Sequence, residues 1–217
     1  GSSSENFDGW PGLDGADSFD GGGRFDSLRY NSDEDYGGSG GIIANFADGA
    51  GTVLDSWGNT DTFTDIDQIV GSQSDDRLEA TGSTGVQFRG EEGDDILIGT
   101  DEDDILEGGD GDDEITDGLG TDQVRGGDGD DTFFNQGGAN DLFDGGEGSD
   151  TLVADETGFA FDTVLVELDP LAGSQTAASR DPATADTLVG VENYTLLGDW
   201  DAVITGSDAA NEITTDA

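Results

Sequence analysis

The chain has 217 residues, and 52 acidic side chains against 6 basic ones give it a formal net charge of −46. It has no cysteine or histidine, and all six basic residues are arginine, which excludes disulfides, thiolate or imidazole metal sites and Schiff-base chemistry. Without a basic patch, nucleic acid and anionic membranes are disfavoured as partners. No stretch approaches the roughly 20 apolar residues of a membrane-spanning helix. Like charges repel, so this composition favours a bound counter-cation.

Two blocks of nine residues lie within the first thirty residues. They are GLDGADSFD (12–20) and GGGRFDSLR (21–29), and each has an aspartate at its sixth place (Asp17, Asp26) and an apolar residue at its eighth. The opening Gly1–Ser4 is typical of an expression remnant, which would place natural targeting signals outside these residues.

The block pattern is interrupted between residues 30 and 65 by glycine-rich turns and apolar runs. The runs at 42–46, 53–57 and 63–70 predict strands. The pattern then resumes in GSQSDDRLE (71–79), with Asp76 at the sixth place. The next block, 80–89, has ten residues, and its sixth place has no aspartate.

A regular run of blocks from residue 90 to residue 153 dominates the chain. It reads GEEGDDILI, GTDEDDILE, GGDGDDEIT, DGLGTDQVR, GGDGDDTFF, the ten-residue NQGGANDLFD, and GGEGSDTLV. The sixth place of the first five blocks is Asp95, Asp104, Asp113, Asp122 and Asp131, and the eighth place is always apolar. A disordered acidic linker does not keep an apolar residue at every ninth position, so the run predicts folded structure.

A second interruption covers residues 154–186, with a strand expected at 164–168. Two matches then reveal an internal duplication. FDGGGRFDSL (19–28) matches FDGGEGSDTL (143–152), and residues 66–78 match residues 191–203. Each unit consists of two blocks, an inserted strand segment and resumed blocks.

The regular run resembles the nonapeptide G-G-x-G-x-D-x-U-x of RTX (hemolysin-type) proteins, which binds Ca²⁺ in a parallel β-roll. The resemblance implies an all-β fold with two short strands per 18-residue coil, here interrupted by two inserted strand and loop segments. It also implies a secreted or cell-surface bacterial protein, exported by type I secretion and folded by calcium outside the cell.

The chemistry of each block suits calcium. Glycine at the first and fourth places lets backbone carbonyls turn toward one ion, and the sixth-place carboxylate adds a charged oxygen. Calcium accepts six to eight such ligands, whereas magnesium prefers a smaller shell that keeps its waters. The predicted ligand set comprises sixth-place side chains and turn residues at the first, third and fourth places: Asp17, Asp26, Asp76, Gly90, Glu92, Gly93, Asp95, Gly99, Asp101, Asp104, Gly108, Asp110, Gly111, Asp113, Leu119, Gly120, Asp122, Gly126, Asp128, Gly129, Asp131, Asn140, Asp141, Gly145, Glu147, Gly148 and Asp150.

If two blocks close one coil, turns 18 or 19 residues apart stack on the same edge of the roll. The first edge would then carry Asp76, Asp95, Asp113, Asp131 and Asp150. The second edge would carry Asp104, Asp122 and either Asn140 or Asp141. We expect several ions, each between neighbours on an edge, and stronger sites on the first edge, because it collects the intact GGxGxD blocks.

Strand alternation points the eighth residue inward. One apolar residue per block makes a thin core: burying a Leu or Phe contributes roughly 1.5–3 kcal/mol, against about 1–2 kcal/mol of backbone ordering per residue. We therefore predict that calcium is needed for folding. The fifth-place Asp94, Asp103, Asp112 and Asp130 are expected to face solvent or to offer only backbone carbonyls.

Two further features leave alternatives open. Ile96, Ile98 and Phe134 fall at outward places on one predicted sheet, where they would contact a partner or a glycan, or be covered by an inserted segment. Paired carboxylates occur throughout, so they do not single out a glycosidase-like acid and base, and we expect no enzyme activity.

The predicted organisation has three parts: degenerate blocks with an insert (1–70), a regular β-roll (71–153), and a second insert with capping blocks (154–217). Two roles follow. One is a calcium-rigidified structural segment of a large adhesin or surface protein. The other is a noncatalytic module of an extracellular enzyme, similar to those of alginate epimerases or serralysin-type proteases, which assists folding or binds polysaccharide. The partners expected are calcium, the rest of a larger parent protein, or polysaccharide.

Overall fold

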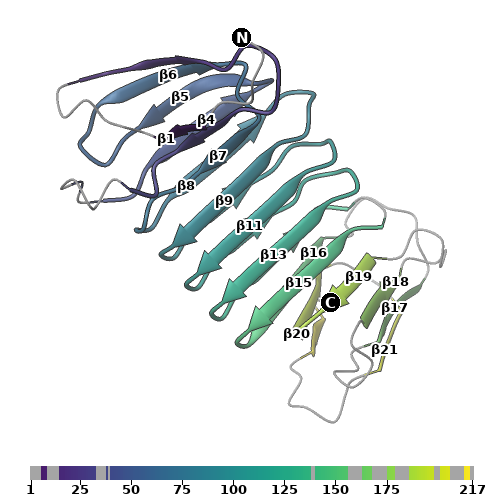
Figure 1. Cartoon of the computed structure of the whole chain (residues 1–217). Coiled ribbons are helices and arrows are strands. Elements are labelled where there is room, and N and C mark those ends of the chain that lie inside the picture. Colours follow the sequence, from purple (N-terminus) through teal and green to yellow (C-terminus); the bar gives the residue numbers. More distant parts are fainter. Residues whose placement is uncertain are drawn as a thin grey trace.

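The structure is a computed structural model of the chain, and it describes residues 6–8, 15–32, 38, 40–137, 140–155, 163–167, 175–178, 186–197, 201–205 and 213–215. Every regular element in these residues is a β-strand, and the strands wind into coils stacked along one axis (Figure 1). In the regular run, Ile96 pairs with Glu114 and Glu114 with Thr132, so one coil takes 18 residues. The predicted all-β parallel β-roll is confirmed.

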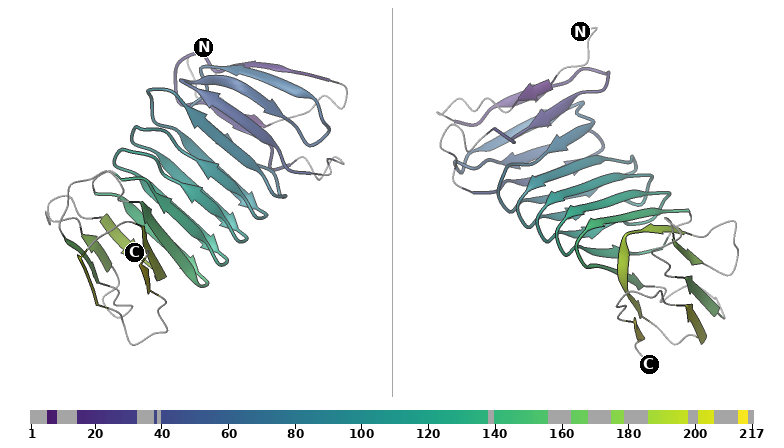
Figure 2. Two further views of the ribbon diagram at one scale, coloured as in Figure 1. Left: turned by 180° about the vertical axis from the view of Figure 1, so that it is seen from behind. Right: turned by 60° about the horizontal axis from the view of Figure 1, so that its bottom comes forward.

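Two sheets form the two faces of the roll, and Figure 2 shows them from two further directions. Sheet A contains, in spatial order, β1 (Asn6–Asp8), β3 (Ser27–Arg29), β7 (Gln68–Val70), β9 (Gln87–Glu92), β11 (Ile105–Asp110), β13 (Gln123–Asp128), β15 (Leu142–Glu147), β19 (Asp186–Val189), β18 (Gln175–Ala178), β17 (Thr163–Glu167) and β21 (Asp201–Thr205). Sheet B contains β2 (Ser18–Asp20), β6 (Thr60–Thr64), β5 (Ala50–Leu54), β4 (Ile43–Ala47), β8 (Arg77–Thr81), β10 (Ile96–Ile98), β12 (Glu114–Thr116), β14 (Thr132–Asn135), β16 (Asp150–Asp155), β20 (Val191–Leu197) and β22 (Ile213–Thr215).

The chain changes sheet at every turn of the regular run, which creates two edges. At the first edge, sheet A strands such as β9 and β11 lead into sheet B strands such as β10 and β12. At the second edge, the chain returns from sheet B to sheet A. The predicted stacking of alternate turns on opposite edges is therefore confirmed.

In the regular run, a single file of apolar side chains fills the space between the sheets. The eighth-place residues Leu97, Leu106, Ile115, Val124, Phe133, Phe143 and Leu152 are at most 1% exposed. Each strand contributes one of them, because its seventh and ninth residues point outward. The rings of Phe133 and Phe143 lie 5.8 Å apart, so successive coils touch through this file. The core is as thin as the sequence predicts.

The first inserted segment widens one sheet. Strands β4, β5 and β6 form an antiparallel meander, with β6 parallel to β2 and β4 parallel to β8. Sheet A receives no added strand, since β3 pairs directly with β7. The prediction of one strand over 63–70 is wrong: Asp65 has a φ of 54° and separates β6 from β7, which lie in opposite sheets.

The second insert repeats this arrangement on the opposite face. Strands β17, β18 and β19 form a meander in sheet A, with β19 parallel to β15 and β17 parallel to β21. Sheet B continues from β16 to β20 without an added strand. The duplicated units are thus placed half a coil out of phase, so corresponding strands such as β2 and β15 fall in different sheets.

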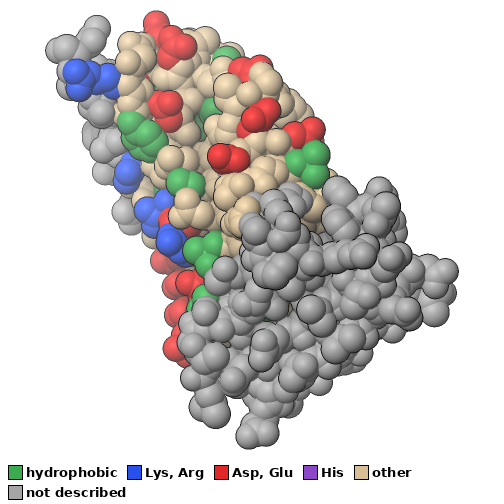
Figure 3. Space-filling model, turned by 90° about the vertical axis from the view of Figure 1, so that its right-hand side faces the viewer, with side chains coloured by type: hydrophobic (Ala, Val, Ile, Leu, Met, Phe, Trp, Pro, Cys, Tyr) green, Lys and Arg blue, Asp and Glu red, His purple; other side chains and the backbone are tan. Residues whose placement is uncertain are grey.

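The outward faces carry rows of side chains in register. On sheet B, Ile98, Thr116 and Phe134 are aligned, which confirms that the outward apolar residues share one sheet. On sheet A, Arg89, Glu107 and Arg125 are aligned, with ion pairs of 3.2 Å and 2.7 Å to Glu107. Figure 3 shows basic side chains along one margin of the molecule. These pairs are exposed, so each contributes little to stability.

Candidate metal sites along the two edges

The sixth-place aspartates of the first edge form a continuous hydrogen-bonded row. The backbone N–H of each donates to the Oδ1 of the aspartate one coil further on. The donor–acceptor pairs are Asp76 to Asp95 (2.7 Å), Asp95 to Asp113 (2.8 Å), Asp113 to Asp131 (3.0 Å) and Asp131 to Asp150 (3.0 Å). All five residues are buried. The structure therefore brings the five predicted first-edge residues together.

In the three central aspartates of this row, the second carboxylate oxygen is buried without a hydrogen-bond donor. This holds for Oδ2 of Asp95, Asp113 and Asp131. A buried charged oxygen without a partner is costly, so the arrangement calls for a cation.

Glycine at the first place allows these oxygens to approach closely, and the surroundings of each first-place glycine are called its cradle here. A Cβ built on Gly108 would lie 2.9 Å from the carbonyl oxygen of Gly126 and closer still to Oδ2 of Asp113. Gly90 and Gly126 have the same surroundings one coil away on either side. Each cradle thus presents a carboxylate oxygen and the carbonyl of the next coil, which is the hard oxygen ligand set of calcium.

Burial dominates the electrostatics of this edge. Burial raises the pKa of Asp95 to about 8, of Asp113 to about 7 and of Asp131 to about 6. Hydrogen bonds from the preceding backbone N–H lower these pKa values, and neighbouring carboxylates raise them. Bare carboxylates in this row are poorly solvated, and either a proton or a cation would offset that cost.

Two sixth-place aspartates differ from the others. Both oxygens of Asp104 accept hydrogen bonds, Oδ1 from the N–H of Val86 (2.7 Å) and Oδ2 from that of Thr100 (2.6 Å), and the Thr100 hydroxyl adds 3.1 Å and 3.3 Å contacts. Asp76 has the same arrangement with Ile42 and Ser72. A second-place Ser or Thr thus takes over much of the role that the sequence assigns to a cation.

The second edge has a shorter row. The N–H of Asp104 donates to Oδ1 of Asp122 and that of Asp122 to Oδ1 of Asp141, both at 2.8 Å. Asp141 therefore holds the position for which Asn140 was the alternative, and Asn140 is exposed with a φ of 67°. The row stops beyond Asp104, because buried Val86 takes the equivalent position in the preceding coil.

The predicted third-place and fourth-place residues lie in the same turns and join neighbouring coils. On the first edge, the N–H of Gly93 donates to the carbonyl of Asp110, and equivalent bonds join Gly111 to Asp128 and Gly129 to Glu147, at 2.8–2.9 Å. On the second edge, Leu119 donates its N–H to the carbonyl of Thr100 at 3.2 Å. These bonds hold the turns one above another.

The N-terminal blocks do not extend either row without a break. Asp17 donates its N–H to Oδ1 of Asp61 (2.8 Å), and β6, β5 and β4 separate its strand from β8. Asp26 is buried on the second edge and donates its N–H to Oδ2 of Asp67 (2.7 Å), but Val86 lies between this pair and Asp104. Neither aspartate joins the regular run.

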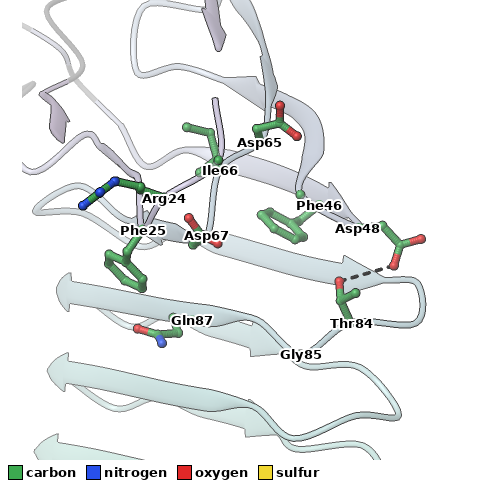
Figure 4. A pocket seen from close by; sticks show the side chains of 12 residues that line it. Arg24, Phe25, Phe46, Asp48, Asp65, Ile66, Asp67, Thr84, Gly85 and Gln87 are labelled. Atoms are coloured by element: carbon green, nitrogen blue, oxygen red, sulfur yellow. Dashed lines mark hydrogen bonds between the residues drawn. The ribbon is translucent and has the colours of Figure 1, made fainter. Parts of the chain in front are cut away.

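A pocket of about 370 Å³ lies near this break in the second edge (Figure 4). Phe25, which is 45% exposed, and Gln87 line it. Two of its carboxylates are engaged locally: Asp48 accepts the N–H of Ser83 at 2.7 Å and the hydroxyl of Thr84 at 3.3 Å, and Asp67 accepts the N–H of Asp26 at 2.7 Å. The pocket therefore marks where the first insert meets the roll and does not continue the row.

The fifth-place aspartates form an outer row that the sequence analysis missed. They are exposed, as predicted, but Oδ1 of Asp75 accepts the N–H of Asp94, Oδ1 of Asp94 that of Asp112, and Oδ1 of Asp112 that of Asp130, at 2.8–3.0 Å. The signal for it was the DD pair repeated in successive blocks.

Asp117 is a second residue that the sequence analysis missed. It occupies the first place of DGLGTDQVR, is 0% exposed, and lies with Asp122 and Asp141 in a group whose carboxylate oxygens are all within 4.8 Å. Burial raises its pKa well above the usual value. The replacement of a first-place glycine by an acid was the available signal.

Fold and edge rows together define a parallel β-roll with cation-binding turns. Residues 89–152 contain four copies of the RTX calcium-binding nonapeptide repeat, matched at 89–124, 98–133, 107–142 and 137–152. The resemblance noted from the sequence is thereby confirmed for this part of the chain. A search of curated proteins finds no match. The described residues include no helix long and apolar enough to cross a membrane.

Proposed function

We propose that this chain is a calcium-dependent structural module, which folds and becomes rigid when Ca²⁺ fills the cradles of its two edges. The observation that carries the proposal is the row of buried Oδ2 atoms on Asp95, Asp113 and Asp131, which accept no hydrogen bond. Calcium would be held by these oxygens and by turn carbonyls such as that of Gly126. The RTX repeat in residues 89–152 supports the choice of metal.

Within the first edge, the strongest positions are expected where two such aspartates follow one another, at the steps Asp95–Asp113 and Asp113–Asp131. Positions next to Asp76 and Asp104 are expected to be weaker, because their carboxylates already accept two or more hydrogen bonds from the protein. We therefore expect each chain to bind several calcium ions.

The parent protein is proposed to be a secreted or surface-exposed bacterial protein, exported by type I secretion. RTX repeats and the net charge of −46 support this, since the charge opposes compaction until calcium arrives. Within such a protein we favour a structural segment of a large adhesin over a module of an extracellular enzyme. The duplicated insert units, which continue both sheets, support a role as one segment of a longer rod.

Circular dichroism tests the folding proposal. The calcium-free chain should be largely disordered in the far ultraviolet, and millimolar Ca²⁺ should produce a β spectrum, whereas the same concentration of Mg²⁺ should not. A calcium-free spectrum equal to the calcium-loaded one would contradict the proposal. Specific polysaccharide binding by calcium-loaded protein on a glycan array would instead favour the enzyme-module role.

A further inference from the structure

Asp117 departs from the repeat at a place where its neighbours need glycine. The corresponding residues of the flanking blocks are Gly99, Gly108 and Gly126. Asp117 follows β12, and its side chain is completely buried. Its Oδ1 accepts the N–H of Gly118 (2.7 Å) and that of Gln136 (3.0 Å). Its Oδ2 accepts no hydrogen bond, so one carboxyl oxygen lies inside the roll without a donor.

Two other carboxylates converge on the same point. Asp122 belongs to the same turn and Asp141 to the turn one coil further on, and each of the three offers an oxygen within 4.8 Å of the others. Oδ2 of Asp122 is also buried without a hydrogen bond. The ion pairs in the described part of the chain involve Glu79, Glu91 and Glu107, all on outward faces, so no arginine there balances the cluster.

The side chain of Asp117 starts at a place where the neighbouring turns have oxygen atoms within 3 Å of the position that a Cβ would take. On the first edge, the space above a first-place glycine lies between its own sixth-place Oδ2 and the carbonyl of the next coil, as at Gly108. At Gly99 the corresponding neighbours are Asp104 Oδ2 and the carbonyl oxygen of Asp117. Asp117 therefore supplies the usual first-place carbonyl to one neighbour and also sends a carboxylate into its own cradle.

We propose that Asp117, Asp122 and Asp141 form a three-carboxylate calcium site that binds the ion more tightly than the first-edge positions do. The inference rests on the proposed function, because it assumes that these edges bind calcium. Affinity for calcium rises with the number of charged ligands, and among the described residues this is the cluster where three carboxylates meet. The second edge then contains the tightest site, although the first edge contains the more regular blocks.

Replacing Asp117 by glycine, which the flanking blocks have at this place, tests this assignment by whether calcium affinity falls or rises. If Asp117 is a ligand, Asp117→Gly should weaken the tightest site by about tenfold or more. If Asp117 only occupies the turn and is not a ligand, the same change should leave the calcium affinity of this site unchanged or higher. Asp117→Asn retains an acceptor for Gly118 and Gln136 but removes the charge, so it separates ligand loss from a disturbed turn.

The measurement is calcium affinity and stoichiometry, by competition with a chromophoric chelator at fixed pH and ionic strength. Glu114→Gln is the matched control, because Glu114 lies in the preceding strand β12, is exposed, and carries the same charge. We expect wild type and Glu114→Gln to share one tight site that Asp117→Gly and Asp117→Asn lose. Tight binding retained in both Asp117 variants would overturn the inference but leave the proposed function standing. A wild-type chain that binds no calcium would overturn both.

Discussion

Asp113 and Asp104 hold the same place in the repeat but lie on opposite edges, and their carboxylates have different surroundings. Oδ2 of Asp113 is buried with no hydrogen-bond donor, whereas both oxygens of Asp104 accept hydrogen bonds from the protein. The cause is the second residue of the block. Gly109 has a φ of 136°, but Thr100 is not among the residues with positive φ, and its N–H and hydroxyl reach Asp104. The residue at the second place thus decides whether both carboxylate oxygens of a turn accept hydrogen bonds from the protein.

The difference shows that the number of repeats overstates the number of equivalent sites. Asp76, with Ser72 at the second place, behaves as Asp104 does. Each row therefore has one end at which the protein itself satisfies the carboxylate, followed by coils in which it does not.

The largest expected effect comes from exchanging the two carboxylates for amides. Asp113→Asn should raise the calcium concentration needed for folding by roughly tenfold or more, because Asp113 borders two neighbouring cradles. Asp104→Asn should reduce stability by about 1–3 kcal/mol, because the new amide group cannot satisfy all of the N–H donors now bonded to the carboxylate. Calcium titrations followed by circular dichroism, and urea unfolding at saturating calcium, measure the two effects.

Stoichiometry provides the control for this pair. Asp113→Asn should retain fewer calcium ions per chain after gel filtration at a fixed free calcium concentration, and Asp104→Asn should retain as many as wild type. Equal loss of calcium in both variants would contradict the distinction between the two carboxylates.

A pH titration of the calcium-free chain gives the next largest effect. Burial raises the pKa of Asp95 to about 8 and of Asp113 and Asp122 to about 7, above the value of about 4 expected when unfolded. A raised pKa means that protonation stabilises the calcium-free fold. That contribution is complete below about pH 4 and is lost as pH rises through the range from 7 to 8. The chain should therefore gain β structure on acidification without calcium.

Calcium binding should show the opposite dependence, because protons and calcium compete for the same oxygens. The calcium concentration at the folding midpoint should fall as pH rises from 6 to 8. An Asp95→Asn/Asp113→Asn double variant should show a smaller pH dependence of this midpoint over the same range. Such a result would assign the pH dependence to the buried row rather than to a general loss of charge. A midpoint that does not change with pH would count against the buried carboxylates as the binding groups.

The sequence predicted the regular run well because two patterns, the sixth-place aspartates and the eighth-place apolar residues, share one nine-residue period there. The nine-residue spacing placed Asp95, Asp113 and Asp131 in one row, and the eighth-place apolar residues placed the core. The two inserts were less predictable, because their strands pair with partners far away in the chain. Nothing local shows that β6 joins β2 while β7, three residues later, joins β3 in the other sheet.

Within the candidate sites, the consensus concealed what the exceptions do. Thr100 and Asp117 both replace glycines of the motif, and a count of matches treats both as weak repeats. Their roles depend on where the side chain points after the turn, and this follows from the backbone angle, which the letters alone do not give. The choice between Asn140 and Asp141 likewise required the strand register of a ten-residue block.

The smallest expected effect concerns Glu91, which stands at the second place of a first-edge turn. It has a φ of 89°, whereas the corresponding Gly109, Gly127 and Gly146 supply the positive φ without a side chain. Glu91→Gly should therefore stabilise the calcium-loaded chain by about 1 kcal/mol, partly offset by loss of the half-exposed 3.1 Å ion pair with Arg89 and of the 3.5 Å hydrogen bond from Asn31. Gly109→Ala should destabilise it, because the added Cβ would meet the carbonyl of Glu91. Urea unfolding at saturating calcium measures both, and a destabilised Glu91→Gly would mean that the contacts of Glu91 outweigh its backbone strain.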